Sequence, residues 1–186
     1  MVVPARHRLQ PPRQGMSLIE VLVAILVVSA GILALLGLMA TSSRLSKTSE
    51  LRSLATLLAA DMADRLRANA AGAKAGEYSL RPSALATGRG APAAQPCTSV
   101  CTAAQMAAWD VALWRAAVFN SLPAGTAFLS YDGGTDTADL WLMWRDPSAS
   151  DADNALIQTG AELAQSCPPG FALTPRPVCM YFRVAR

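Results

Sequence analysis

The chain has 186 residues, a length that suits one ordinary domain or one domain with a membrane element. Its formal net charge of +3 comes from Arg6, Arg8 and Arg13, because the other 13 Lys and Arg equal the 13 Asp and Glu in number. This balance gives no support to a nucleic-acid partner, whose phosphates would require a basic surface.

The first 15 residues form a basic, proline-containing leader, and an apolar block follows at residues 21–40. A secretory signal peptide has its cleavage site after the apolar core, whereas here Gly15 precedes it. A cut after Gly15 would therefore remove the arginines and keep the helix. Twenty helical residues span ~30 Å, the thickness of the hydrocarbon core of a bilayer. The arginines predict a cytoplasmic leader, with the remainder of the chain outside the inner membrane.

Glu20 lies at the front of the apolar block. An acidic side chain deep in a membrane costs roughly 2.5 to 3.5 kcal/mol on insertion scales, and such residues usually have a partner. The amine that cleavage would create on Met16 lies one helical turn away, and the same amine of a neighbouring subunit is an alternative partner. We therefore expect Glu20 to set the register in a helix bundle. An uncleaved signal anchor is the alternative interpretation.

Helical spacing continues beyond the apolar block, so that one helix is predicted from Ser17 to about Asn69. Apolar residues recur at intervals of three and four in its second half: Leu51, Leu54, Leu58, Met62 and Leu66. Asp61 and Arg65 have the spacing of a weak ion pair. This amphipathic half needs a partner, and we expect a soluble domain to pack against it.

The remaining elements follow in chain order. Residues 70–96 are predicted to form a surface connection, and a second helix begins near Thr102 and ends before Pro123. Its apolar stripe is predicted to contain Met106, Trp109, Leu113, Ala117 and Val118. Two strands around a glycine-rich turn occupy residues 126–147, a short helix is possible near residues 161–165, and a last strand occupies residues 177–186. We therefore expect an antiparallel sheet of at least three strands that packs against the long helix.

Four cysteines lie on the side predicted to be exported, where an oxidising environment favours disulfides: Cys97, Cys101, Cys167 and Cys179. Three pairings are possible, and the local one, Cys97 with Cys101 and Cys167 with Cys179, closes the shortest loops. Zinc is disfavoured, because the chain has one histidine, His7, and neither cysteine spacing is that of a zinc knuckle.

No catalytic residue, metal or cofactor is predicted. Cleavage would remove the one histidine, so that neither a Ser-His nor a Cys-His pair can form within the subunit. Two groups of carboxylates have ligands that calcium prefers: Asp132, Asp136 and Asp139, and Asp151 and Asp153. Neither group follows EF-hand spacing, and aspartates beside glycines are typical of turns.

The segment GMSLIEVLVAILVVSAG, residues 15–31, resembles the class III leader and first helix of type IV pilins and pseudopilins. This resemblance implies that prepilin peptidase cuts between Gly15 and Met16, that the new amine of Met16 is methylated, and that Glu20 pairs with a subunit amine during assembly. Gly31 and Gly37 are either close helix contacts or sites where the helix bends or loosens inside a filament. Because major pilins usually have proline where Gly37 stands, the resemblance favours a melted segment between the two glycines.

The implied fold class is α+β, a type IV pilin fold with a long N-terminal helix packed on a small antiparallel sheet. The expected segments are a cleaved leader at 1–15, a transmembrane and filament-core half-helix at 16–40, and a periplasmic domain at 41–186.

Later motifs, LAADMADRLRAN at residues 58–69, C-x3-C, LPAG and LWLMWRD, are similar to those of minor pilins of the type IV pilus modification (PilV) type. The expected partners are then prepilin peptidase, other minor pilins, the major pilin, the inner-membrane assembly machinery and a large tip adhesin. Such a subunit passes from the inner membrane to the pilus. The alternatives are a minor pseudopilin of a type II secretion system and a membrane-anchored periplasmic enzyme or binding protein.

Overall fold

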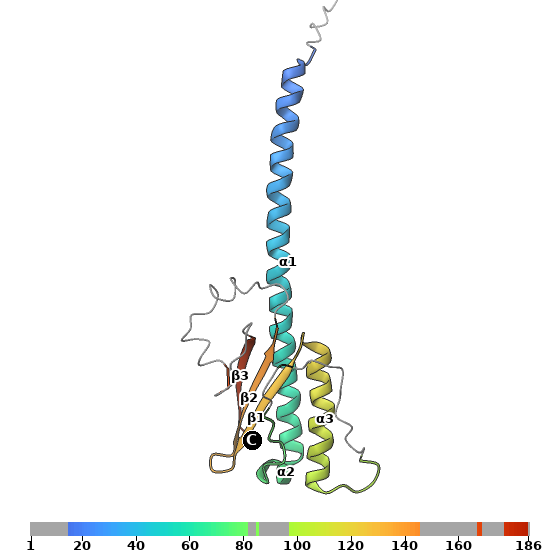
Figure 1. The fold of residues 1–186 in the computed structure, drawn as a ribbon, viewed down its shortest axis with the longest axis vertical. Coiled ribbons are helices and arrows are strands. Elements are labelled where there is room, and N and C mark those ends of the chain that lie inside the picture. Colours follow the sequence, from blue (N-terminus) through green and yellow to red (C-terminus); the bar gives the residue numbers. More distant parts are fainter. Residues whose placement is uncertain (1–14, 82–84, 86–96, 146–166, 169–176, 186) are drawn as a thin grey trace, which may run out of the picture. The chain divides into compact units, whose positions relative to one another are not determined.

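The computed structural model describes residues 15–81, 85, 97–145, 167–168 and 177–185. These residues form the helices α1 (Leu18–Ala68), α2 (Ala70–Lys74) and α3 (Ala103–Ser121) and the strands β1 (Thr126–Asp132), β2 (Thr137–Trp144) and β3 (Val178–Ala185), which are labelled in Figure 1. The chain divides into two compact units, residues 1–43 and residues 44–186. The predicted long helix is confirmed and begins and ends within one residue of the expected positions.

The core of the second unit joins the second half of α1, α3 and one face of the sheet. On α1, Leu51, Met62 and Leu66 are buried as the apolar spacing predicts, whereas Leu54 and Leu58 are partly buried and pack against the core. Ala55 and Ala59 are also buried.

The sheet is antiparallel with the strand order β1-β2-β3, which confirms the three predicted strands. Its inner face contributes alternate residues to the core, among them Leu129, Leu140 and Leu142. Cross-strand register places Phe128 opposite Trp141 and Trp141 opposite Tyr181 on the other face. The α+β pilin architecture expected from the sequence is therefore present.

Helix α3 has the predicted ends, but the side that it buries differs from the prediction. Met106 is 36% exposed and Leu113 is 43% exposed, whereas Ala107, Trp114 and Val118 are buried. The helix carries apolar residues around most of its circumference, so that its apolar periodicity does not select one face.

The predicted surface connection at residues 70–96 is wrong for its first part. Residues 70–74 form α2, Tyr78 is fully buried, and Leu80 pairs with Leu129 as an isolated antiparallel bridge beside β1. Residues 82–84 and 86–96 lie outside the described residues, as does the possible short helix near residues 161–165.

Candidate functional site

The start of α1 is formed by residues that the sequence singled out. Gly15, Met16 and Ser17 precede the helix and are exposed. The Ser17 Oγ accepts a hydrogen bond from the backbone N–H of Glu20 at 3.3 Å, and its carbonyl oxygen accepts from Val21 at 3.3 Å. Ser17 therefore caps α1.

Glu20 lies in the first turn of α1 and is exposed. The spacing Ser17-x-x-Glu20 is that of a capping box, a pattern that is readable from the sequence. A carboxylate in the first turn also interacts favourably with the partial positive charge of the helix N-terminus.

The apolar residues of the first unit are exposed all around the helix. Large side chains are 52–78% exposed at these positions: Leu18, Ile19, Leu22, Val23, Ile25, Leu26, Val27, Val28, Ile32, Leu33, Leu35, Leu36, Leu38 and Met39. Among the described residues, α1 is the one helix long and apolar enough to cross a membrane. An apolar surface of this extent requires lipid or other protein around it.

Two hydroxyl groups of the same segment are satisfied within the helix. Ser29 donates to the carbonyl oxygen of Ile25 at 2.7 Å, and Thr41 donates to that of Gly37 at 3.1 Å. Such bonds keep hydroxyls from being unsatisfied in an apolar environment. Glu20 is the one charged residue in the sequence from Leu18 to Ser43.

Gly31 and Gly37 both lie within α1, which is continuous through them. A Cβ atom added at either position would meet nothing within 4 Å. Because glycine has no side chain, the backbone of the helix is exposed at both positions in the single chain. Loosening of the helix at these glycines inside a filament stays a prediction.

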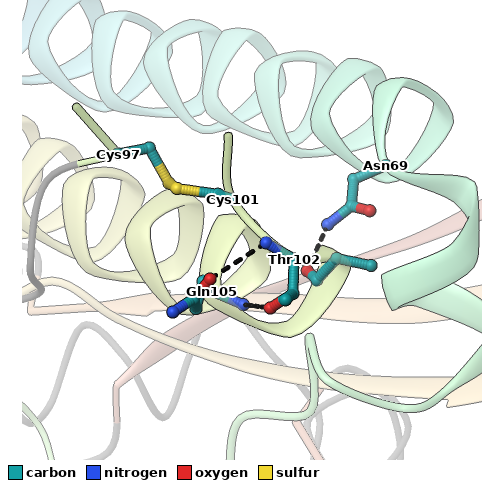
Figure 2. The surroundings of a disulfide bond; sticks show 6 residues. Asn69, Cys97, Cys101, Thr102 and Gln105 are labelled. Atoms are coloured by element: carbon teal, nitrogen blue, oxygen red, sulfur yellow. Dashed lines mark hydrogen bonds between the residues drawn. A yellow bond between two sulfur atoms is a disulfide. The ribbon is translucent and has the colours of Figure 1, made fainter. Parts of the chain in front are cut away.

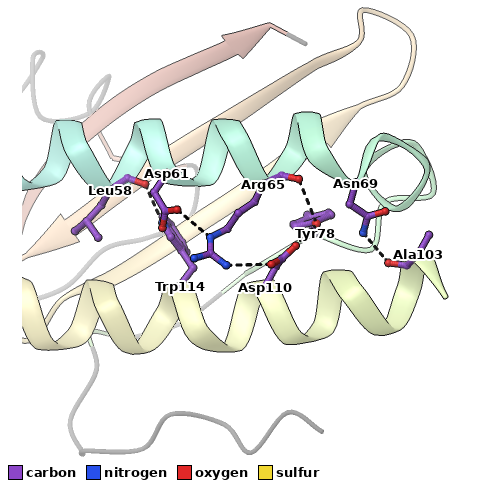
Figure 3. Close-up of polar contacts among 8 residues, drawn as sticks. All are labelled: Leu58, Asp61, Arg65, Asn69, Tyr78, Ala103, Asp110 and Trp114. Carbon is purple, nitrogen blue, oxygen red and sulfur yellow. Dashed lines mark hydrogen bonds and ion pairs between the residues drawn. The ribbon is translucent and has the colours of Figure 1, made fainter. Parts of the chain in front are cut away.

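A layer of charged and polar groups joins the second half of α1 to α3 (Figure 3). The guanidinium of Arg65 contacts Asp61 at 3.1 Å, the pair predicted from the sequence, and also Asp110 of α3 at 3.0 Å. The hydroxyl of Tyr78 donates to the other carboxylate oxygen of Asp110 at 2.6 Å. Burial, with the hydrogen bond to Asp110, raises the pKa of Tyr78 well above its ordinary value.

Two further hydrogen bonds fix the register of α3 along α1. The Nε1 of Trp114 donates to the carbonyl oxygen of Leu58 at 2.8 Å, and the Nδ2 of Asn69 donates to that of Ala103 at 2.7 Å. Asn69 also caps α2 by accepting from the backbone N–H of Gly72. The sequence did not reveal these bonds, because they join residues far apart along the chain.

The start of α3 is held by a disulfide and a capping box (Figure 2). Cys97 and Cys101 are bonded, with their Cα atoms 5.9 Å apart. Next to them, the side chains of Thr102 and Gln105 each accept a hydrogen bond from the other residue's backbone N–H, at 3.2 and 2.9 Å. A second disulfide joins Cys167 to Cys179 on β3. The structure therefore contains the local pairing that the sequence favoured.

The aspartates considered for calcium have other partners. Asp132 accepts from the backbone N–H of Gly134, Asp136 accepts from the hydroxyl of Tyr131, and Asp139 forms an ion pair with Arg183 at 2.9 Å. The described part of the chain holds no group of three or more His, Cys, Asp or Glu placed to bind a metal. Asp151 and Asp153 lie outside the described residues.

Comparison with known families gives two matches, which overlap by a few residues. Residues 11–40 match the prokaryotic N-terminal methylation motif, and residues 38–112 match the family described as type IV pilin Tt1218. No curated protein and no solved structure matches the chain. With the long apolar helix and small antiparallel sheet, these matches define a type IV pilin-like protein. The matches support a pilin precursor for a pilus or a pseudopilus.

Proposed function

We propose that the protein is a minor pilin, a structural subunit that takes part in the initiation and assembly of a type IV pilus, in a complex at its tip. The observation that carries this proposal is the first unit: a helix with apolar side chains exposed all around it and a single charged residue, Glu20, in its first turn. A helix of this kind suits two apolar environments, the bilayer and the core of a filament.

Processing is proposed to begin with prepilin peptidase cutting between Gly15 and Met16. Both residues are exposed and precede α1, so that this peptide bond lies outside the helical hydrogen-bond ladder. The cut removes Arg6, Arg8 and Arg13 and creates an amine on Met16, which becomes methylated. The chain then begins with a positive charge about one helical turn from Glu20.

Assembly is proposed to proceed by pairing of Glu20 with a subunit amine. A lone carboxylate in an apolar core is costly, whereas an ion pair with a hydrogen bond offsets much of its desolvation. A subunit in the wrong axial register would leave both charges unpaired among apolar side chains. Glu20 thus selects the register, and Gly31 and Gly37 are proposed as the positions at which the helix adjusts.

The minor-pilin assignment is supported by motif LAADMADRLRAN, residues 58–69. Four of its residues, Leu58, Asp61, Arg65 and Asn69, take part in the polar layer around α3. We propose other minor pilins, the major pilin, the inner-membrane assembly machinery and a large tip adhesin as partners, with no cofactor, no catalytic role and no nucleic acid. The second unit is proposed to lie in the periplasm before assembly, where an oxidising environment favours its disulfides.

The test exchanges Glu20 for glutamine, which keeps the shape of the side chain and removes its charge, and for alanine. We expect Glu20→Gln and Glu20→Ala to be processed normally but to be absent from sheared filaments, as measured by quantitative mass spectrometry. Glu50→Gln is the matched control, because Glu50 is exposed on α1 and pairs only weakly with Lys47. Incorporation of either Glu20 variant at the wild-type level would overturn the proposed pairing.

A gene deletion separates the two classes of filament. For a minor pilin, we expect deletion to reduce surface pili and to leave protein export intact. Loss of export with normal piliation would instead assign the protein to the pseudopilus of a type II secretion system.

A further inference from the structure

The outer face of the sheet carries a row of three aromatic side chains. Phe128, Trp141 and Tyr181 are cross-strand neighbours on β1, β2 and β3. The ring centroids of Phe128 and Trp141 are 5.3 Å apart in an edge-to-face arrangement, and those of Trp141 and Tyr181 are 4.9 Å apart. Tyr181 is 41% exposed and Phe128 and Trp141 are half-buried, so that the row presents part of its aromatic surface to solvent.

An ordered polar group lies beside this row. Arg183 contacts both carboxylate oxygens of Asp139, at 2.9 and 3.3 Å, and the hydroxyl of Tyr181 donates to Asp139 at 2.5 Å. The guanidinium has five N–H donors, and these contacts leave some of them for a ligand. Because the ion pair already holds the guanidinium in place, a ligand would not have to order it on binding.

The other end of the row carries a cation. The guanidinium of Arg81 lies 5.8 Å from the centroid of the Phe128 ring, and Arg81 has no ion-pair partner among the described residues. The next acidic residue of β1 on this face is Asp132, four positions from Phe128 and about 13 Å away at the rise of a strand. That distance exceeds the Debye length of about 8 Å at physiological ionic strength. Asp139 of β2 lies on the same face and nearer to the row, but it is already paired with Arg183, so that the unpaired charge beside the row is the positive charge of Arg81.

We propose that the row Phe128–Trp141–Tyr181 is a binding platform for an acidic saccharide, a sugar chain that carries carboxylates. Sugar rings have apolar C–H faces that stack on aromatic rings and hydroxyl edges that accept and donate hydrogen bonds. The aromatic row matches the C–H face, Arg183 and Asp139 match hydroxyls, and Arg81 matches a carboxylate. A single-stranded nucleic acid fits less well, because its regular phosphates need a basic groove rather than one unpaired arginine.

The experiment uses the full chain in detergent micelles and titrates a hexamer of galacturonate, with calorimetry as the readout. We expect saturable binding of this probe and at least about tenfold weaker binding of maltohexaose, a neutral sugar of equal length, since it offers no charge to Arg81. Trp141→Leu and Arg81→Gln should each weaken binding of galacturonate by at least about tenfold, as expected when a central anchor is removed.

Matched controls lie on α3, outside the aromatic row. Trp109→Leu removes one indole and Arg115→Gln removes one exposed guanidinium, and both should bind the galacturonate hexamer as the wild type does. Arg81→Gln keeps the test decisive if Trp141→Leu is unstable, because Arg81 is exposed.

Three outcomes would overturn the proposal: no binding of galacturonate by the wild type, equal binding of the neutral sugar, or equal loss of binding in the α3 controls. Binding of an oligothymidylate in place of the sugar, abolished by Trp141→Leu, would assign the row to base stacking and would also overturn it. These outcomes are independent of filament assembly, since no step requires Glu20.

Discussion

Asp110 is the residue on which the contact between α1 and α3 depends most. Its side chain is 15% exposed and accepts from both Arg65 and Tyr78. Asp110→Ala removes the short hydrogen bond of the hydroxyl of Tyr78, a fully buried residue, and leaves it with the carbonyl oxygen of Arg65 at 3.5 Å and the side chain of Asn69 as polar neighbours. It also leaves Arg65, whose side chain is 25% exposed, with one carboxylate instead of two.

The size of the effect follows from these two losses. An unsatisfied buried hydroxyl costs about 1–3 kcal/mol. Breaking a fully buried ion pair costs about 3–5 kcal/mol, but partial exposure and the remaining contact with Asp61 reduce this share to about 1 kcal/mol. We expect Asp110→Ala to lower the free energy of unfolding of the second unit by about 2–4 kcal/mol, the sum of these two losses.

The assay is urea unfolding of the full chain in detergent micelles, followed by tryptophan fluorescence, because Trp114 lies at the same helix contact. Asp64→Ala is the control: its ion pair with Arg67 is exposed, with side chains 78% and 53% accessible, and its loss should cost less than about 0.5 kcal/mol. In a double-mutant cycle, Tyr78→Phe should recover about 1 kcal/mol of the Asp110→Ala effect. Equal effects of Asp110→Ala and Asp64→Ala would refute the reasoning.

Three further predictions concern the second unit. Burial and the hydrogen bond to Asp110 raise the pKa of Tyr78 above the ordinary 10.0, so that the free energy of unfolding of the wild type should fall as the pH rises above about 10. Tyr78→Phe should lessen this fall in urea titrations at alkaline pH. An unchanged dependence of the free energy of unfolding on pH would contradict the prediction. The hydrogen bond from Arg183 lowers the pKa of Asp139 below 3.8, so that the contribution of Asp139 to stability is present above about pH 4 and lost below it. The free energy of unfolding of Asp139→Asn should therefore differ from that of the wild type at pH 6 and converge with it near pH 2. A difference in stability that stays constant with pH would exclude this linkage. A Cβ atom at Gly125 would lie 2.6 Å from the carbonyl oxygen of Val118, whereas one at Gly133 would meet nothing within 4 Å. Gly125→Ala should therefore lower the melting temperature, and Gly133→Ala should leave it unchanged. Equal melting temperatures of the two variants would show that α3 and β1 adjust freely.

The elements with strong local signals were predictable from the sequence. The helix from Leu18 to Ala68 follows from apolar spacing, α3 begins after its cap Thr102, and the strands alternate around a glycine-rich turn. These features depend on residues that are close together along the chain, and so a local sequence pattern predicts them. The cap at Ser17 was also readable from its spacing to Glu20, although it was missed.

The features that were not predictable depend on contacts across long stretches of chain. Asp110 meets Arg65 over 45 residues and Tyr78 over 32, and no local pattern marks such partners. Helix α3 is apolar on more than one side, so that periodicity selected Met106 and Leu113, whereas tertiary packing buried Ala107 and Trp114. The buried position of Tyr78 was hidden in a segment rich in alanine and glycine.

The most direct test of the proposed function is the intact mass of the protein recovered from sheared filaments. The proposal predicts the mass of residues 16–186 with both disulfides formed and one added methyl group. Protein found in filaments with residues 1–15 still attached would contradict it, because Met16 would then have no free amine for Glu20 to pair with.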